Sequence, residues 1–188
     1  MLINNETIIK DTDPLIREKS DPVSLPLSAE DEQLLREMFQ YVQDSTDEEK
    51  AKKFNLRPAV GISAIQVGVR KQLTAVIVDD YDKNGNPVKY QYMLANPKIV
   101  SSSVQKAYLN AGEGCLSVVA PHEGHVIRSA RVTVKGFDLI QNKNITIRAR
   151  GYLAIVLQHE LDHFKGTLFY DYIDPENPEK TVDGAMVI

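Results

Sequence analysis

The sequence predicts an α+β fold in which antiparallel or mixed β-sheets pack around a central buried helix. Two observations lead to this prediction. Segments rich in β-branched residues follow one another from about residue 73 to residue 150, and a helix that is apolar on nearly every side comes directly after them. The order is strands and then a helix, not the regular alternation that is typical of parallel sheets. A length of 188 residues suits one domain, so we expect a single domain over residues 1–188.

Composition narrows the class of protein. The hydrophobic share of 43% and the charged share of 26% are ordinary for soluble proteins. A net charge of −4 gives no electrostatic reason to expect general binding to nucleic acid or to an anionic membrane. Cys115 is the one cysteine, so no intrachain disulfide can form, and no run approaches the roughly 20 apolar residues that span a bilayer. We expect a cytoplasmic protein without a secretory signal, and a monomer.

The first predicted element is a helix that begins after Ser28. Ser28 can cap its N-terminus, and apolar residues then recur at helical spacing along one face: Leu34, Leu35, Met38, Phe39 and Val42. The charged segment 44–58 reads as a solvated connection with at most a short helix.

The middle of the chain predicts two β-hairpins. Residues 73–80 form a buried strand, Asn84-Gly85 is a hairpin signal, residues 88–94 return, and Asn96-Pro97 ends the run. Residues 131–139 and 144–150 alternate apolar and polar side chains, which predicts a second hairpin that turns at 141–143.

The last predicted helix runs from about Tyr152 to Phe164 and stops at Lys165-Gly166. Because it is apolar all round, it belongs in a core. The tail from residue 174 reads as mostly irregular with a short apolar end.

The buried helix carries the segment HELDH. His159 and His163 are four residues apart and therefore lie on one face, where both imidazoles can bind one metal ion, and Glu160 beside them can reach a water molecule on that ion. The alternative is a surface helix with paired charges. We disfavour it because burying these side chains in an apolar helix costs several kcal/mol unless a partner satisfies them.

A catalytic metal site of this kind usually has a third protein ligand and an open position. Cys115, which two glycines precede in GEGCLS, is the leading candidate beside the HELDH helix. The residues alone leave rivals open: His122 and His125 on a loop, and the downstream carboxylates Asp174, Glu176 and Glu179.

A third segment, residues 59–66, is built of small residues that let a backbone approach another group closely. It ends at Gln66, whose amide N–H could face a developing negative charge. A turn before a strand is the simpler interpretation of this segment taken by itself.

Together GISAIQ, EGCLS and HELDH resemble the peptide deformylase family, whose patterns are G-x-G-x-A-A-x-Q, E-G-C-x-S and H-E-x-D-H. The second and third segments match at every fixed position. In the first, Ala59 and Ser63 replace a glycine and an alanine. The chain is similar to the longer, type 2 form common in Gram-positive bacteria. If the backbone at Ala59 needed a positive φ, the added methyl would cost roughly 1 kcal/mol and shift the pocket wall.

The resemblance implies a function and a set of site residues. It implies hydrolysis of the formyl amide (a C–N bond outside the peptide chain) of N-terminal formyl-methionine on nascent proteins, with formate as product, transient ribosome association, and Fe²⁺ as the usual ion, which Zn²⁺, Ni²⁺ or Co²⁺ can replace. Cys115, His159 and His163 would bind the ion, Glu160 would be the acid/base, and Gln66 with the Leu116 N–H would stabilise the oxyanion. The implied pocket for the first side chain of the substrate comprises Val60, Gly61, Tyr152, Ile155 and Val156, and Gly114 is a further implied substrate-binding residue.

Two other functions compete with this one. An H-E-x-x-H metalloendopeptidase would take its third ligand from a downstream carboxylate or histidine instead of Cys115. A non-catalytic binding module whose fold is stabilised by a bound metal would not need Glu160. The sequence excludes neither on residues alone.

Overall fold

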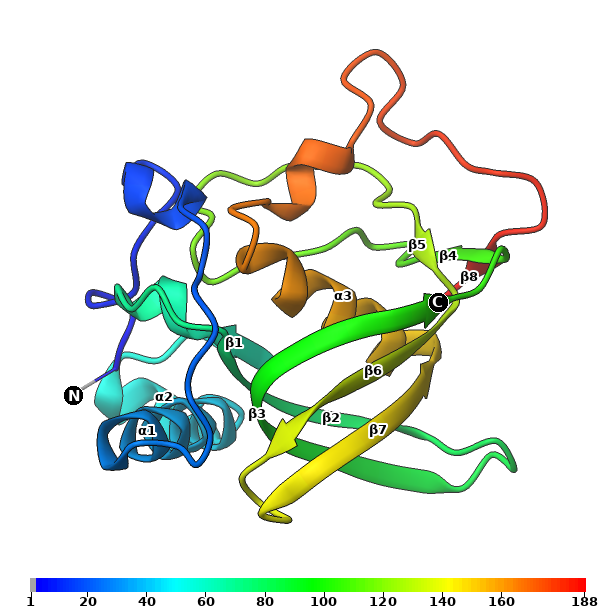
Figure 1. Cartoon of the computed structure of the whole chain (residues 1–188). Coiled ribbons are helices and arrows are strands. Elements are labelled where there is room, and N and C mark those ends of the chain that lie inside the picture. The colour runs from blue at the N-terminus through cyan, green and yellow to red at the C-terminus, as the bar shows by residue number, and fades with distance from the viewer. Residues whose placement is uncertain (1–2) are drawn as a thin grey trace.

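The computed structural model describes residues 3–188 and has two β-sheets and three α-helices (Figure 1). The larger sheet is antiparallel, with strand order β1 (Gly61–Ser63), β2 (Leu73–Tyr81), β3 (Pro87–Ser102), β6 (Arg131–Asp138) and β7 (Lys143–Arg150). The smaller sheet is mixed and has the order β5 (Arg128–Ser129), β4 (Lys106–Tyr108) and β8 (Met186–Val187). The predicted α+β class with antiparallel and mixed sheets is confirmed.

The helices are α1 (Ala29–Ser45), α2 (Glu48–Phe54) and α3 (Gly151–His163), and three short 3-10 helices cover Pro14–Arg17 (η1), Ala64–Val67 (η2) and Phe169–Tyr172 (η3). α1 begins where predicted, because the Ser28 side chain accepts a hydrogen bond from the Asp31 N–H at 3.1 Å. α2 buries none of its residues, so the prediction of a solvated connection with a short helix is also confirmed.

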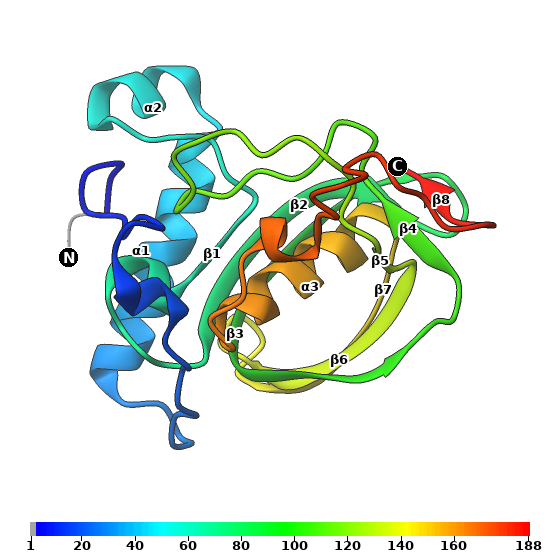
Figure 2. The ribbon, with the colours of Figure 1, turned by 90° about the horizontal axis from the view of Figure 1, so that it is seen from above.

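Two helices pack on opposite faces of the larger sheet. Alternate residues of β2 belong to different clusters: Ala75 packs with α1, whereas Val76 packs with α3. Figure 2 shows the sheet curving around α3, with α1 outside the curve. α3 can therefore be apolar on nearly every side because sheet, loops and β5 surround it.

One boundary prediction was wrong. β3 does not end at Asn96-Pro97 but continues to Ser102, and its register against β6 shifts between Ala95 and Lys98. Proline has no N–H for the ladder and is tolerated at such a bulge. Gly136 lies opposite, where a methyl group would come within 2.9 Å of the Pro97 Cα. The bulge thus lets the long strand pass the proline.

The secondary structure of the C-terminal part of the chain is close to the prediction, except for one short strand. α3 starts and stops one residue earlier than expected, and Gly166, with φ of 71°, follows its end. The apolar end of the tail forms β8, which pairs in parallel with β4 and was not predicted as a strand. Over residues 3–188, no helix has the length and apolar character needed to cross a membrane.

The packing of α1 gives a first prediction. Leu35 is fully buried, so Leu35→Ala should lower the free energy of unfolding by about 3 kcal/mol through lost contacts and a residual cavity. Arg36→Ala, on the exposed face of the same helix, should change it by no more than about 0.5 kcal/mol. Urea denaturation measures both, and equal losses would contradict the assigned packing.

Candidate metal centre

α3 and one loop bring together three side chains that could bind a metal ion. His159 and His163 lie on consecutive turns of α3 with ring centroids 5.2 Å apart, and Cys115 comes from the loop that follows β4. Ligand atoms of the three residues all lie within 4.8 Å of one another, and Cys115 Sγ is 3.4 Å from His163 Nε2. Among residues 3–188, this is the group of three or more such side chains that could hold an ion.

The hydrogen bonds around His159 fit a metal site. Its Nδ1 lies 2.8 Å from Glu113 Oε2, which places the ring proton on Nδ1 and leaves the Nε2 lone pair for a cation. A carboxylate behind a ligating histidine is the usual way to fix the tautomer and orientation of such a ring. One sulfur and two imidazole nitrogens are a donor set suited to Zn²⁺ or Fe²⁺. The residues present therefore fit a divalent ion.

The electrostatics agree with this assignment. Burial by itself would raise the pKa of the Cys115 thiol, but the neighbouring imidazoles of His163 and His159 hold that pKa well below its usual range. Burial would lower the pKa of His159, whereas its bonds to Cys115 and Glu113 raise it well above normal. The lowered pKa of Cys115 favours loss of the thiol proton, and the deprotonated thiol is the form in which cysteine binds a metal.

Three of the rival ligands, His122, His125 and Asp174, make other contacts. His122 stacks on Tyr170 with ring centroids 4.1 Å apart, and the Nδ1 of His125 lies 3.0 Å from the Glu179 carbonyl oxygen. The Asp174 carboxylate accepts a hydrogen bond from the Glu176 N–H at 3.0 Å in its own turn. None of these residues belongs to the group formed by Cys115 and the two histidines.

A buried ion network behind the centre was missed by the sequence analysis. Arg128 donates from Nε and Nη2 to both oxygens of Glu113, at 2.5 and 3.0 Å, and from Nη1 to Asp162 at 2.9 Å. The side chains of Arg128 and Glu113 are each 4% exposed. Burial would raise the pKa of Glu113, but the bonds from His159 and Arg128 hold it below its usual range. The motifs contain Glu113 and Asp162, whereas nothing in the sequence marks Arg128 as their partner.

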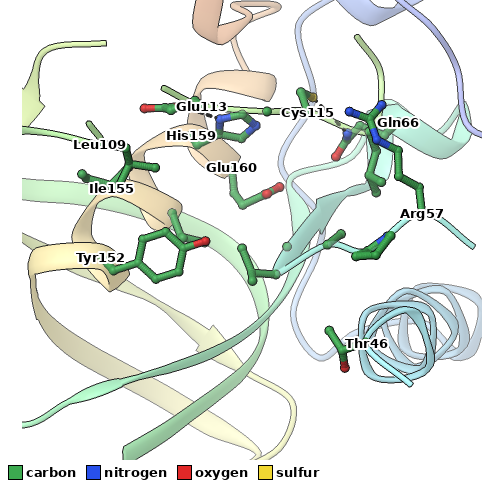
Figure 3. Close-up of a pocket in the computed structure, with 17 residues that line it drawn as sticks. Thr46, Arg57, Gln66, Leu109, Glu113, Cys115, Tyr152, Ile155, His159 and Glu160 are labelled. Atoms are coloured by element: carbon green, nitrogen blue, oxygen red, sulfur yellow. Dashed lines mark hydrogen bonds and ion pairs between the residues drawn. The ribbon is translucent and has the colours of Figure 1, made fainter. Parts of the chain in front are cut away.

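An apolar cavity of about 300 Å³ opens beside Glu160 (Figure 3). The residues that the resemblance implied for substrate binding all line it: Val60, Gly61, Gly114, Tyr152, Ile155 and Val156. Gln66, Cys115, Leu116 and His159 line it too. The cavity therefore places a space for an apolar side chain directly next to Cys115 and His159.

Glu160 lies against the backbone of β1. A methyl group at Gly61 would come within 2.7 Å of the Glu160 carboxyl carbon, so this position requires glycine for close approach. Glu160 is 4% exposed, and burial raises its pKa against the opposing effect of His159 and His163. A buried carboxylate with a raised pKa next to a cavity is suited to accepting and returning a proton.

Gln66 and Leu116 lie on the same side of the centre. The Gln66 Nε2 donates toward Cys115 Sγ at 3.5 Å and to Ser117 Oγ at 3.2 Å, while its Oε1 accepts the Ser63 N–H at 2.9 Å. The carbonyl of Leu116 accepts a hydrogen bond from Lys10 Nζ at 3.1 Å. Both residues line the cavity together with Cys115.

The expectation of strain at Ala59 does not apply. Within residues 3–188 the non-glycine residues with positive φ are Asn55, Asn96 and Asn142, so Ala59 has an ordinary backbone conformation. Its N–H donates to Ser45 Oγ at 3.1 Å, and its methyl forms part of the cavity wall.

A cysteine sulfur, two imidazoles from one helix and a buried glutamate beside an apolar cavity define a metal-dependent hydrolase centre. Comparison with known proteins narrows this class. The profile of the polypeptide deformylase family matches residues 5–179, so the chain belongs to that family.

Relatives match along the whole chain. The chain is 46% identical to peptide deformylase 2 of Bacillus subtilis (strain 168), covering 100% of this chain and 99% of the relative. It is also 46% identical to a peptide deformylase of Staphylococcus epidermidis (strain ATCC 12228), covering 100% of both. The fold is similar to the crystal structure of peptide deformylase from Ehrlichia chaffeensis in complex with actinonin, with a TM-score of 0.70, 29% identity and coverage of 95% of this chain and 92% of that one.

The ion network gives a second prediction. Glu113→Gln removes one charge and leaves Arg128 buried with half of its anionic partners, so it should lower the free energy of unfolding by about 3 kcal/mol. Glu179→Gln, the same change at an exposed position, should shift it by less than about 0.5 kcal/mol. Chemical denaturation at neutral pH compares the two, and a small effect at Glu113 would refute the structural role of this network.

Proposed function

We propose that this protein removes the formyl group from the N-terminal formyl-methionine of newly synthesised peptides and releases formate. The observation that carries the proposal is the grouping of Cys115 with His159 and His163 beside buried Glu160. This grouping occurs in a chain that is 46% identical over its length to a peptide deformylase. The chemistry is hydrolysis of the C–N bond of a linear amide.

In this proposal Cys115, His159 and His163 hold one divalent ion, natively Fe²⁺. When bound, the ion supplies a Lewis acid that lowers the pKa of a coordinated water molecule. The thiolate adds negative charge to the donor set, while Glu113 orients His159 through its Nδ1. Zn²⁺, Ni²⁺ and Co²⁺ suit the same nitrogen and sulfur donors.

The residues of the chain then carry out binding and proton transfer. The apolar cavity takes the methionine side chain between Val60 and Ile155, which sets the formyl carbon beside Glu160. Glu160 accepts a proton from the attacking water and returns it to the leaving amine as the C–N bond breaks. The Gln66 Nε2 and the Leu116 N–H donate to the oxygen that gains negative charge. Formate and a free α-amine are the products.

The substrate also suggests the surroundings in which the protein works. Formylated nascent chains emerge at the ribosome, so we propose transient association there and a cytoplasmic location. We further propose that residues 1–188 act as one domain and as a monomer.

Glu160 provides the direct test of catalysis. Glu160→Ala should keep the metal and lower the rate of formate release from formyl-Met-Ala-Ser by at least about 100-fold, because a positioned acid/base contributes roughly 10²–10⁴ in rate. Metal content and formate are measured on the same anaerobic sample. Release of formate by the variant at the wild-type rate would contradict the assigned role of Glu160, and a wild-type protein that binds metal but releases no formate would be a metal-binding module in place of a catalyst.

Cys115 separates a deformylase from a metalloendopeptidase. Cys115→Ala removes the sulfur, so the purified protein should contain less than a tenth of the wild-type metal, since losing a ligand weakens such a site strongly. His122→Ala, a change at the rejected loop ligand, should retain the full content. Full metal content in Cys115→Ala, together with loss in His122→Ala, would contradict the assigned ligand set.

A further inference from the structure

Ser63 occupies a position where the family pattern has alanine, and its hydroxyl lies against Glu160. It is the last residue of β1 and is fully buried. Its Oγ is 2.8 Å from Glu160 Oε2, 3.0 Å from the Glu160 carbonyl oxygen and 3.3 Å from Thr74 Oγ1. A side chain that departs from the pattern thus touches the group to which the proposed function assigns proton transfer.

We propose that Ser63 is a positioning residue that holds the Glu160 carboxylate by its Oε2 and leaves Oε1 free beside Gly61 at the wall of the cavity. The inference rests on the proposed function of Glu160. It concerns orientation: Ser63 touches neither the three ligand side chains nor, in this proposal, the substrate.

The hydroxyl has one proton and three acceptors within reach. The carboxylate oxygen is the nearest, and a hydrogen bond to an ionised acceptor is roughly twice as strong as a neutral one. Thr74 donates its own proton to the Ile62 carbonyl oxygen at 3.0 Å, so its oxygen competes only as a neutral acceptor. The Ser63 proton therefore goes to Glu160.

The carboxylate has little else to fix its rotation. Among residues 3–188, Ser63 supplies the one hydrogen bond to the Glu160 carboxylate. The terminal torsion of a glutamate is broad, so packing alone sets it loosely. Gly61 presents only backbone to the carboxyl group, so it offers no side chain that could hold the carboxylate by a hydrogen bond. With alanine at position 63 the carboxylate would turn more freely and hold its reactive oxygen toward the substrate for less of the time.

Substitution by the family's own residue tests this without disturbing the fold. Ser63→Ala in the metal-loaded enzyme should lower kcat for formyl-Met-Ala-Ser by roughly tenfold, in line with the sensitivity of rates to small misplacements. KM should stay within about twofold, because the cavity that binds methionine is unchanged. Metal content should equal that of the wild type.

Ser20→Ala is the matched control. Ser20 is also a buried serine, but within the described part of the chain its Oγ has no hydrogen-bond partner. Its loss should leave kcat and KM unaltered. A crystal structure of Ser63→Ala adds a readout independent of activity and should show the Glu160 carboxylate in more than one orientation.

Three outcomes would overturn the inference: kcat of Ser63→Ala within twofold of the wild type, a rise in KM without a fall in kcat, or a single unchanged orientation of Glu160 in the crystal. Absence of formate release by the wild-type protein is a distinct result. It would contradict the proposed function, and the role of Ser63 that rests on it.

Discussion

The helix α3 carries His159, Glu160, Asp162 and His163 into the interior. Side chains from the surrounding segments offset the free-energy cost of burying these polar groups. An ionised group inside a protein costs several kcal/mol unless it is paired and hydrogen-bonded. Arg128 donates hydrogen bonds to Asp162 and Glu113, Glu113 accepts one from His159, and Ser63 donates one to Glu160. Since these partners come from β1, β5 and the loop after β4, the centre is held from three sides.

The curved sheet makes this arrangement compatible with a substrate cavity. Strands β2, β3, β6 and β7 of the sheet pack on the apolar sides of α3, so the polar side faces β1 and the cysteine loop. Gly61 lets β1 lie directly against Glu160, and the cavity forms where no side chain fills the space between β1, α3 and that loop. The packing of β1, α3 and the cysteine loop thus produces both the cluster of reactive groups and the apolar cavity beside it.

Elements that depend on residues close in sequence could be predicted, whereas elements that depend on contacts between distant segments could not. The cap at Ser28, the two hairpins and the buried HELDH helix each depend on residues close in the chain. By contrast, β1 has three residues and β8 two, too few for a periodic signal, and both exist through pairing with distant strands. β3 passes Pro97 because Gly136 stands opposite, a contact that no local rule contains.

The site divides in the same way. Motif spacing identified Cys115, His159, His163 and Glu160, and the cavity residues followed from resemblance. Arg128 has no motif, and its partners are 15 and 34 residues away in sequence. The effect of Ser63 could not be foreseen either, because a departure from a pattern shows a difference but not what the new hydroxyl contacts.

The central claim is that one ion joins the loop sulfur to the two helix imidazoles. The most direct measurement is anomalous X-ray diffraction at the metal edge from crystals grown anaerobically. It should place one ion about 2.3 Å from Cys115 Sγ and about 2.0–2.1 Å from a nitrogen of His159 and of His163, as is usual for zinc with these ligands. An ion bound without the cysteine, or none at these three residues, would contradict the claim.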